Sequence, residues 1–334
     1  MDGLEISGRR FDRPVFVPSI SSYESQIPPV SAVELQLATD EPITLVSSFD
    51  LHENDDLLEI TKVFQSEGGI VLADSGGYEH SRYNFWSHCE WKWGVRNYKK
   101  VSLEVNPDLI FSYDLFPEEH DSPAKYALKL AALLDETSRD LDLRRIIPVL
   151  HLQPRRGRSI FDAADAAEIS TSLLQRFPCC LVAIPERELG EGLHKRAKSV
   201  REIARAIDIV RPNGGLHVLG CGNPLAIAFM ADAGVSIVDG LEWCRTTIST
   251  VDWHLHHHQH LEAFEVSPLE RSEKIDYLLQ TRGGYYTKWG LHNLQGFRRL
   301  MENIRQSIAD NSLRLFVERN YGKKAAELFD YARL

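Results

Sequence analysis

Eight short apolar segments, each of five or six residues, constrain the fold of this chain more than any other feature. They are Pro14–Pro18, Ile43–Ser48, Ile70–Asp74, Leu109–Asp114, Ile146–His151, Cys180–Ile184, Leu216–Gly220 and Val235–Asp239. Their length and apolar character are typical of strands buried on both faces, as in parallel sheets. Eight such strands predict an α/β fold in which the sheet closes into a (β/α)₈ TIM-type barrel.

Helical patterns separate the later strands, as the connections of a parallel sheet require. They cover Ala124–Thr137, Ile160–Arg176, Lys195–Val210 and Pro224–Ala233. A doubly wound open sheet is the alternative fold, but no Gly-x-Gly-x-x-Gly turn follows the first strand.

The chain is longer than a barrel needs. Its 334 residues suggest about two domains, whereas single α/β barrels often run to roughly 250 residues. Beyond residue 250 the pattern becomes helical, over Pro268–Gln280, Leu291–Ala309 and Ser312–Arg333. We therefore predict a catalytic barrel over residues 1–250, with an inserted loop at 75–100, and a C-terminal helical region, 251–334, packed on the barrel.

Composition indicates a reduced, cytoplasmic protein. No stretch approaches the roughly 20 apolar residues of a membrane span, and the first ten residues lack an apolar signal core. Five cysteines, an odd number, form a poor disulfide framework. We therefore expect no membrane partner.

Charge is unevenly distributed. The net charge of −10 argues against indiscriminate coating of nucleic acid. From Lys288 onward, however, nine Lys and Arg residues face five acidic residues. This basic tail either docks a phosphate backbone or forms an ordinary solvated helix pair.

Polar residues fall at the ends of the predicted strands, where barrels carry their chemistry. Asp74 ends a buried strand and precedes Gly76 and Gly77, and Asp239 ends another strand before Gly240. Two aspartates placed in this way suggest bond breaking by paired carboxylates. For each one separately, the structural alternative is an aspartate that caps a helix.

Six segments, in order, resemble the tRNA-guanine transglycosylase superfamily, which exchanges guanine in a nucleic acid for a 7-deazaguanine. Asp74-Ser-Gly-Gly-Tyr-Glu79 is similar to the family's Asp-Ser-Gly-Gly-Phe/Tyr-Gln, and Leu109–Asp114 to its strand ending in a base-reading aspartate. Ala183-Ile184 with Leu189-Gly190-Glu191 resembles Ala-Ile-Gly-Gly-Leu-x-Val-Gly-Glu, and His217–Pro224 resembles Tyr-Leu-Met-Gly-Val-Gly-x-Pro. Gly234–Arg245 aligns without gaps on the nucleophile segment, and His292-Asn293-Leu294 on the family's His-Asn-Leu helix.

The resemblance implies a pentosyltransferase with two catalytic carboxylates. Exchange with retention at C1′ needs a covalent intermediate, and Asp239 matches the nucleophile. Asp74 is the candidate that gives a proton to the leaving guanine and takes one from the incoming base. The expected partners are a nucleic acid, DNA or tRNA, and a 7-deazaguanine base, with a homodimer or a partner subunit left open.

The same resemblance implies a set of base contacts. Asp114 can accept two hydrogen bonds from the guanine edge. Tyr78 and Leu219 match positions that sandwich the base, although both are ordinary core residues otherwise. The remaining candidate base contacts are Ser75, Gly76, Gly77, His151 and Gly220.

Nucleic-acid contacts are predicted from basic and aromatic clusters. The segment Tyr83–Lys100 interleaves aromatics with cations, which is typical of a single-strand stacking platform and equally of a lid with buried tryptophans. Arg155, Arg156 and Arg158 form a candidate phosphate contact, or else a solvated charge run. Arg245 completes this set.

Departures from the family concern metal and substrate. The family's Cys-x-Cys-x-x-Cys zinc site is absent, since no cysteine follows Cys244, and Pro185-Glu186 replaces a base-binding Gly-Gly pair. We therefore expect no cofactor and no metal site. Zinc bound by the histidine tract 254–260, read as a helix, with His292 is the alternative. These departures favour DNA over tRNA as the substrate.

Two other functions are compatible with the sequence. Some members of the superfamily are non-catalytic subunits, but the presence of Asp74, Asp114 and Asp239 argues against that role here. A hydrolase that uses water in place of the second base is the other alternative.

Overall fold

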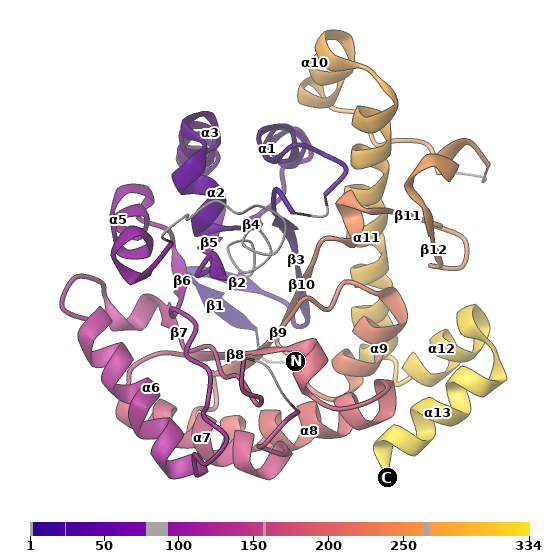
Figure 1. Ribbon diagram of the computed structural model, residues 1–334. Coiled ribbons are helices and arrows are strands. Elements are labelled where there is room, and N and C mark those ends of the chain that lie inside the picture. The colour runs from indigo at the N-terminus through magenta and orange to yellow at the C-terminus, as the bar shows by residue number, and fades with distance from the viewer. Residues whose placement is uncertain (1–2, 24, 78–92, 156–157, 264–266) are drawn as a thin grey trace.

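Eight parallel strands form one sheet that closes into a barrel (Figure 1). The computed structural model describes residues 3–23, 25–77, 93–155, 158–263 and 267–334. The barrel strands are β3 (Val15–Ile20), β4 (Ile43–Val46), β5 (Ile70–Ala73), β6 (Leu109–Phe111), β7 (Ile146–Ile147), β8 (Leu181–Pro185), β9 (Gly215–Leu219) and β10 (Ile237–Gly240). Each of the eight predicted segments overlaps one of them, so the predicted fold class is confirmed.

Strand order follows the chain around the ring. Each strand pairs with its sequence neighbour from β3 to β7 and from β8 to β10, and β10 pairs with β3. A parallel bridge between Val149 and Ala183 joins β7 to β8. Two backbone hydrogen bonds of 2.8 Å accompany it, one from Leu150 N to Ala183 O and one from Ala183 N to Pro148 O.

Helices surround the ring. They are α1 (Pro29–Ala38), α2 (Ser48–Glu53), α3 (Asp55–Ser66), α5 (Val95–Val105), α6 (Pro123–Thr137), α7 (Ala163–Arg176), α8 (Leu193–Val210), α9 (Pro224–Asp232), α10 (Glu273–Arg282), α11 (Tyr285–Ala309), α12 (Leu313–Tyr321) and α13 (Lys323–Arg333). The four helices predicted between the later strands are confirmed, whereas α1, α2, α3 and α5 were not predicted. No helix in the described ranges is both long enough and apolar enough to cross a bilayer.

The barrel interior is plugged at the N-terminal end of its strands. The hairpin of β1 (Leu4–Ile6) and β2 (Arg9–Phe11) buries Leu4 and Ile6 in one apolar cluster with the inward-facing residues of the strands. In Figure 1 this hairpin lies behind the barrel, so the viewer faces the C-terminal ends of the strands. That end is the one left for a functional site.

Helix α11 completes the outer ring. It packs against β3 and lies between α1 and α9, the place where a barrel needs its eighth helix (Figure 1). The predicted division at residue 250 therefore cuts across the ring, because the last barrel helix lies beyond it. Helices α12 and α13 then pack on α8 and α9.

One buried amide anchors α11 to the end of β10. The Asn293 side chain donates to the carbonyl oxygens of Trp243 and Thr246, both at 2.7 Å, and accepts from Ile248 N at 3.1 Å. Neighbouring His292 contacts Ile248 O through Nε2 at 2.8 Å. The turn that follows Asp239 is thus held by α11.

The histidine tract does not form the single helix that we predicted, because only its second half is helical, in the short 3₁₀ helix η4 (His258–Ala263). Leu255–His257 forms β12, which pairs antiparallel with β11 (Thr246–Ile248). The tract enters this strand through Trp253, whose φ of 59° lies in the left-handed region. Pairing with β11 imposes the two-residue period of a strand, so the predicted grouping of histidines on helix faces fails.

We predict that Asn293→Ala lowers the free energy of unfolding by about 2–3 kcal/mol, because three buried backbone groups lose their partner. Asn303→Ala, an exposed change on the same helix, should alter it by less than about 0.5 kcal/mol. Urea unfolding of both variants measures the difference. Equal values would contradict the anchoring role of Asn293.

Candidate active site

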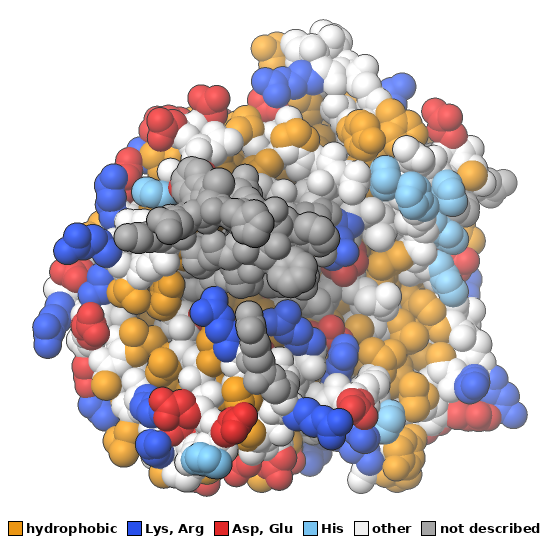
Figure 2. All heavy atoms as spheres, viewed as in Figure 1, with side chains coloured by type: hydrophobic (Ala, Val, Ile, Leu, Met, Phe, Trp, Pro, Cys, Tyr) orange, Lys and Arg blue, Asp and Glu red, His pale blue; other side chains and the backbone are white. Residues whose placement is uncertain are grey.

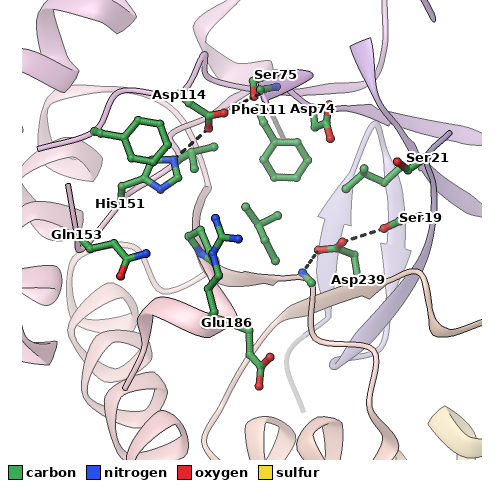
Figure 3. Close-up of a pocket in the computed structure, with 18 of the residues that line it drawn as sticks. Ser19, Ser21, Asp74, Ser75, Phe111, Asp114, His151, Gln153, Glu186 and Asp239 are labelled. Carbon is green, nitrogen blue, oxygen red and sulfur yellow. Dashed lines mark hydrogen bonds and ion pairs between the residues drawn. The ribbon is translucent and has the colours of Figure 1, made fainter. Parts of the chain in front are cut away.

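The C-terminal ends of the strands surround a cavity of about 1220 Å³. Asp74 follows β5, Asp114 and His151 lie beyond the ends of β6 and β7, and Asp239 belongs to β10. All four line the cavity, and Figure 3 shows them pointing into it from different walls. The structure therefore brings the four predicted strand-end residues together in one site.

Asp239 is held by its two neighbouring strands. Oδ2 accepts from Ser19 Oγ of β3 at 2.8 Å (Figure 3). Oδ1 lies 2.8 Å from His217 Nε2 of β9 and 3.3 Å from Gly220 N. Because β10 lies between β3 and β9, both side chains reach the same carboxylate. The three contacts fix the carboxylate at the edge of the cavity.

His217 belongs to the interior of the barrel. Its ring is fully buried and meets Phe111 edge-on at 5.1 Å. Within the described residues its Nδ1 has no hydrogen-bond partner. Nε2 therefore is the ring nitrogen that donates to Asp239, because a carboxylate oxygen only accepts hydrogen bonds.

Two glycines explain the turn after Asp74. The Asp74 Oδ1 atom accepts from Gly76 N at 2.8 Å and from Ser48 N at 3.3 Å. Gly76 has φ +69°, and a Cβ there would lie 2.6 Å from Phe49 N. A Cβ on Gly77 would lie 2.0 Å from Asp114 Oδ2. A side chain at Gly77 would displace Asp114, and one at Gly76 would collide with the backbone of α2.

Asp114 is supported from two sides. Ser75 Oγ donates to Oδ2 at 2.7 Å, and His151 Nε2 lies 3.1 Å from Oδ1. The Asp114 side chain retains 20% of its exposure, compared with 5% for His151. Asp114 therefore presents a fixed carboxylate to the cavity.

Behind Asp114 lies a second, buried carboxylate. Glu188 follows β8, and its Oε1 lies 3.0 Å from His151 Nδ1 while Oε2 accepts from Leu152 N at 2.7 Å. Burial alone would lower the pKa of His151, but hydrogen bonds to Asp114 and Glu188 outweigh it and raise that pKa to about 9. His151 is thus an imidazolium at neutral pH.

An aromatic wall covers His151. Phe116 stacks on the ring with centroids 4.0 Å apart, and the Arg155 guanidinium lies 5.9 Å from the Phe116 ring centre. Leu219 and Gly220 line the same cavity. Tyr78, the other predicted stacking residue, lies outside the described residues, as does Arg156.

The carboxyl group of Glu242 lies close to Gly240, the residue after Asp239. Burial raises the pKa of Glu242, and the charges of Asp239 and Glu186 raise it further, against the lowering effect of Arg245. Its Oε2 packs so closely on Gly222 that a Cβ there would collide with it. The surroundings of Glu242 thus disfavour its ionised form next to the Asp239 carboxylate.

The predicted lid or stacking platform is described only in part. Residues 78–92 of this segment lie outside the described ranges, and residues 95–100 belong to α5, not to a loop. Trp93 is buried, and its indole nitrogen donates to Ser75 O at 2.8 Å. At Trp93, therefore, the alternative of a lid with buried tryptophans agrees with the structure.

Basic residues border the cavity. Arg155, Arg187 and Arg245 line it, and Arg158 is exposed nearby in the sequence. Figure 2 shows Lys and Arg side chains near the centre of this face. By contrast, five of the nine basic residues of the C-terminal tail form ion pairs with acidic residues: Arg298, Arg299, Arg314, Lys323 and Arg333. Part of the positive charge of the tail is therefore neutralised within the protein.

The described residues offer no group of three or more His, Cys, Asp or Glu side chains arranged to hold a metal ion. His292 is committed to Ile248 O, and His254 contacts Asn320 O through Nε2. The histidine alternative for zinc therefore gains no support from this part of the chain.

No family model matches the chain, and no curated protein is significantly similar to it.

Several site residues were not predicted. Ser19, His217, Glu188, Phe116 and Glu242 reach the cavity or its carboxylates only through the barrel closure. The sequence contained one signal for His217. This residue interrupts an apolar strand two positions before Leu219, and side chains two positions apart lie on the same face of a strand.

The raised pKa of His151 predicts a pH-dependent stability. The protonated ring stabilises the fold fully below the unfolded pKa near 6.5, and this contribution is lost as pH rises through about 9. The stability difference between wild type and His151→Gln should fall by about 2–3 kcal/mol from pH 6 to pH 9.5.

Urea unfolding across this pH range measures the difference. The surface variant Asn303→Ala, which titrates no group, should differ from wild type by a constant amount. A constant or growing difference for His151→Gln would contradict the charged state of His151.

Proposed function

We propose that this chain is a nucleic-acid guanine transglycosylase that exchanges guanine for a 7-deazaguanine base through a covalent aspartyl–sugar intermediate. The observation that carries the proposal is the convergence of Asp74, Asp114 and Asp239 on one cavity at the C-terminal end of the barrel. The cavity exceeds the roughly 300–1,000 Å³ of ordinary ligand pockets, so a nucleotide fits within it.

In the first step Asp239 attacks C1′ of the target nucleotide. The C1′–N9 bond breaks, its electron pair passes to N9 of guanine, and the Asp74 carboxyl group donates the proton that guanine takes up. The product is an ester between Asp239 and the sugar. Ser19, His217 and Gly220 hold the carboxylate in place for this attack.

In the second step the incoming base replaces Asp239. The Asp74 carboxylate takes the N9 proton of the 7-deazaguanine, N9 attacks C1′, and the ester bond returns its electron pair to Asp239. Two inversions leave the anomeric configuration unchanged. Both bases bind to Asp114, because its carboxylate accepts hydrogen bonds from the two N–H groups that guanine and 7-deazaguanine share.

DNA is favoured over tRNA as the substrate. The cysteines of the family's zinc site, which helps to build the tRNA-binding surface, are absent from the sequence. Five of the nine basic residues of the tail are engaged in internal ion pairs. Phosphate contacts are left to the basic residues at the cavity, Arg155, Arg187 and Arg245.

The covalent intermediate is the first test. Incubation with fluorescent DNA, followed by denaturing electrophoresis, should leave a protein band shifted by the attached strand. Asp239→Asn should abolish the band, because an amide is a poor nucleophile. Asp56→Asn, an exposed change on α3, is the matched control and should retain it. A shifted band that persists in Asp239→Asn would refute the assignment.

The other two carboxylates should have separable effects. Asp74→Asn should reduce kcat by roughly 100-fold or more, the scale of lost general acid–base catalysis. Asp114→Asn should weaken apparent binding of guanine by about 1–3 kcal/mol with a smaller change in kcat. The reason is that an NH₂ group, a donor, replaces one of the two oxygens that accept hydrogen bonds from the base. Steady-state exchange kinetics distinguish the two, and equal small effects would count against this division.

A further inference from the structure

Asp114 ends a continuous chain of hydrogen bonds that starts in the core. It runs from Leu152 N to Glu188, from Glu188 to His151 Nδ1, and from His151 Nε2 to Asp114, with distances of 2.7, 3.0 and 3.1 Å. Exposure rises along it, from 0% for the Glu188 side chain through 5% to 20% for Asp114. A buried carboxylate is thus linked to the one that faces the cavity.

The geometry fixes the protonation of the ring. Carboxylates only accept hydrogen bonds, and each ring nitrogen of His151 faces a carboxylate oxygen. A neutral imidazole has only one N–H group, so the lone pair of its other nitrogen would face a carboxylate oxygen without a hydrogen bond between them. Both contacts are satisfied together when the ring carries two protons.

Every element around His151 contributes to this arrangement. Tyr126 of α6 accepts from His151 N at 3.1 Å and donates to Leu115 O at 2.6 Å, which positions the backbone. Phe116 stacks on one face of the ring, with Arg155 beyond it. The titratable and charged groups that face the ring are therefore Asp114, Glu188, Tyr126 and, through Phe116, Arg155.

We infer that Glu188 is a positioning residue that, through a doubly protonated His151, sets Asp114 as a fixed pair of acceptors and so selects ligands with two adjacent N–H donors. Ser75 and His151 each occupy one lone pair of the Asp114 carboxylate, on different oxygens. One further lone pair on each oxygen is left for the cavity. Two neighbouring acceptors match the N1–H and 2-amino edge of a guanine-type base.

The inference rests on the proposed function for the identity of the ligand, but not for the state of the ring. Glu188→Gln replaces one acceptor oxygen by an NH₂ group and removes the buried charge. His151 then keeps only Asp114 as a carboxylate partner. Asp114 keeps its contact with Ser75, but the His151 ring that supports its other oxygen is less firmly held and less readily charged, whereas Asp74 and Asp239 are untouched.

The first measurement uses the ligand-free protein. Nitrogen-15 NMR of the histidine rings, with His151 assigned by its absence in His151→Gln, should show a doubly protonated ring at pH 7.5. In Glu188→Gln its titration midpoint should move to lower pH by at least one unit, the scale of one lost charge partner. A neutral His151 ring in the wild type, or an unchanged midpoint in the variant, would overturn the inference.

The second measurement is selectivity at pH 7.5. Titration calorimetry compares 9-methylguanine with 9-methylhypoxanthine, which lacks the 2-amino group. Glu188→Gln should weaken 9-methylguanine binding on the order of 10-fold and should weaken 9-methylhypoxanthine binding less. The ratio of the two affinities should therefore fall. Glu168→Gln, an exposed change on α7, should preserve it. An equal loss for both ligands would overturn the selective role.

Folding and function are controlled separately. Thermal unfolding establishes that Glu188→Gln is folded. If Glu188→Gln is unfolded, His151→Gln serves in its place. His151→Gln should also reduce the preference for 9-methylguanine over 9-methylhypoxanthine. An unaltered preference in His151→Gln would overturn the inference. Absence of guanine exchange in the wild type would defeat the proposed function while the ring titration still decided the role of Glu188.

Discussion

Closing eight parallel strands into a ring sends alternate side chains of every strand into one interior. At the N-terminal end that interior is apolar and is sealed by Leu4 and Ile6. At the other end the same alternation delivers Ser19, His217 and Asp239 to one point, from three adjacent strands. The site therefore depends on closure more than on any single interaction, because residues more than 200 positions apart become neighbours.

The three carboxylates are supported in different ways. Asp239 is held by a hydroxyl, an imidazole and a backbone amide, whereas Asp74 accepts from two backbone amides. Asp114 is tied to the cationic side chain of His151. These surroundings suit a nucleophile, a proton carrier and a fixed acceptor, respectively. Burial raises the pKa of Glu242, which lies beside Asp239.

Much of the fold could be predicted from the sequence, because buried parallel strands are continuous apolar runs. The ends of these runs then identified four candidate site residues, Asp74, Asp114, His151 and Asp239. Supporting residues could not be found in this way, since Glu188 and Ser19 have ordinary local contexts and meet their partners only through tertiary structure. The histidine tract was misread because local spacing does not reveal pairing with β11.

The early helices were missed because their patterns are short. Helix α2 has six residues, too few for a helical period to stand out. Helix α11 follows the last barrel strand, β10, by more than 40 residues, so its sequence position gave no sign that it packs against β3 and closes the ring. The predicted C-terminal region, 251–334, thus supplies one helix of the ring.

Incorporation of radiolabelled guanine tests the central claim most directly. Duplex DNA, single-stranded DNA and bulk tRNA are incubated in parallel with the wild type and with Asp239→Asn. The account predicts label in DNA, with less in tRNA, and none with the variant. Label in tRNA alone would contradict the preferred substrate, and no label in any nucleic acid would contradict the transglycosylase itself.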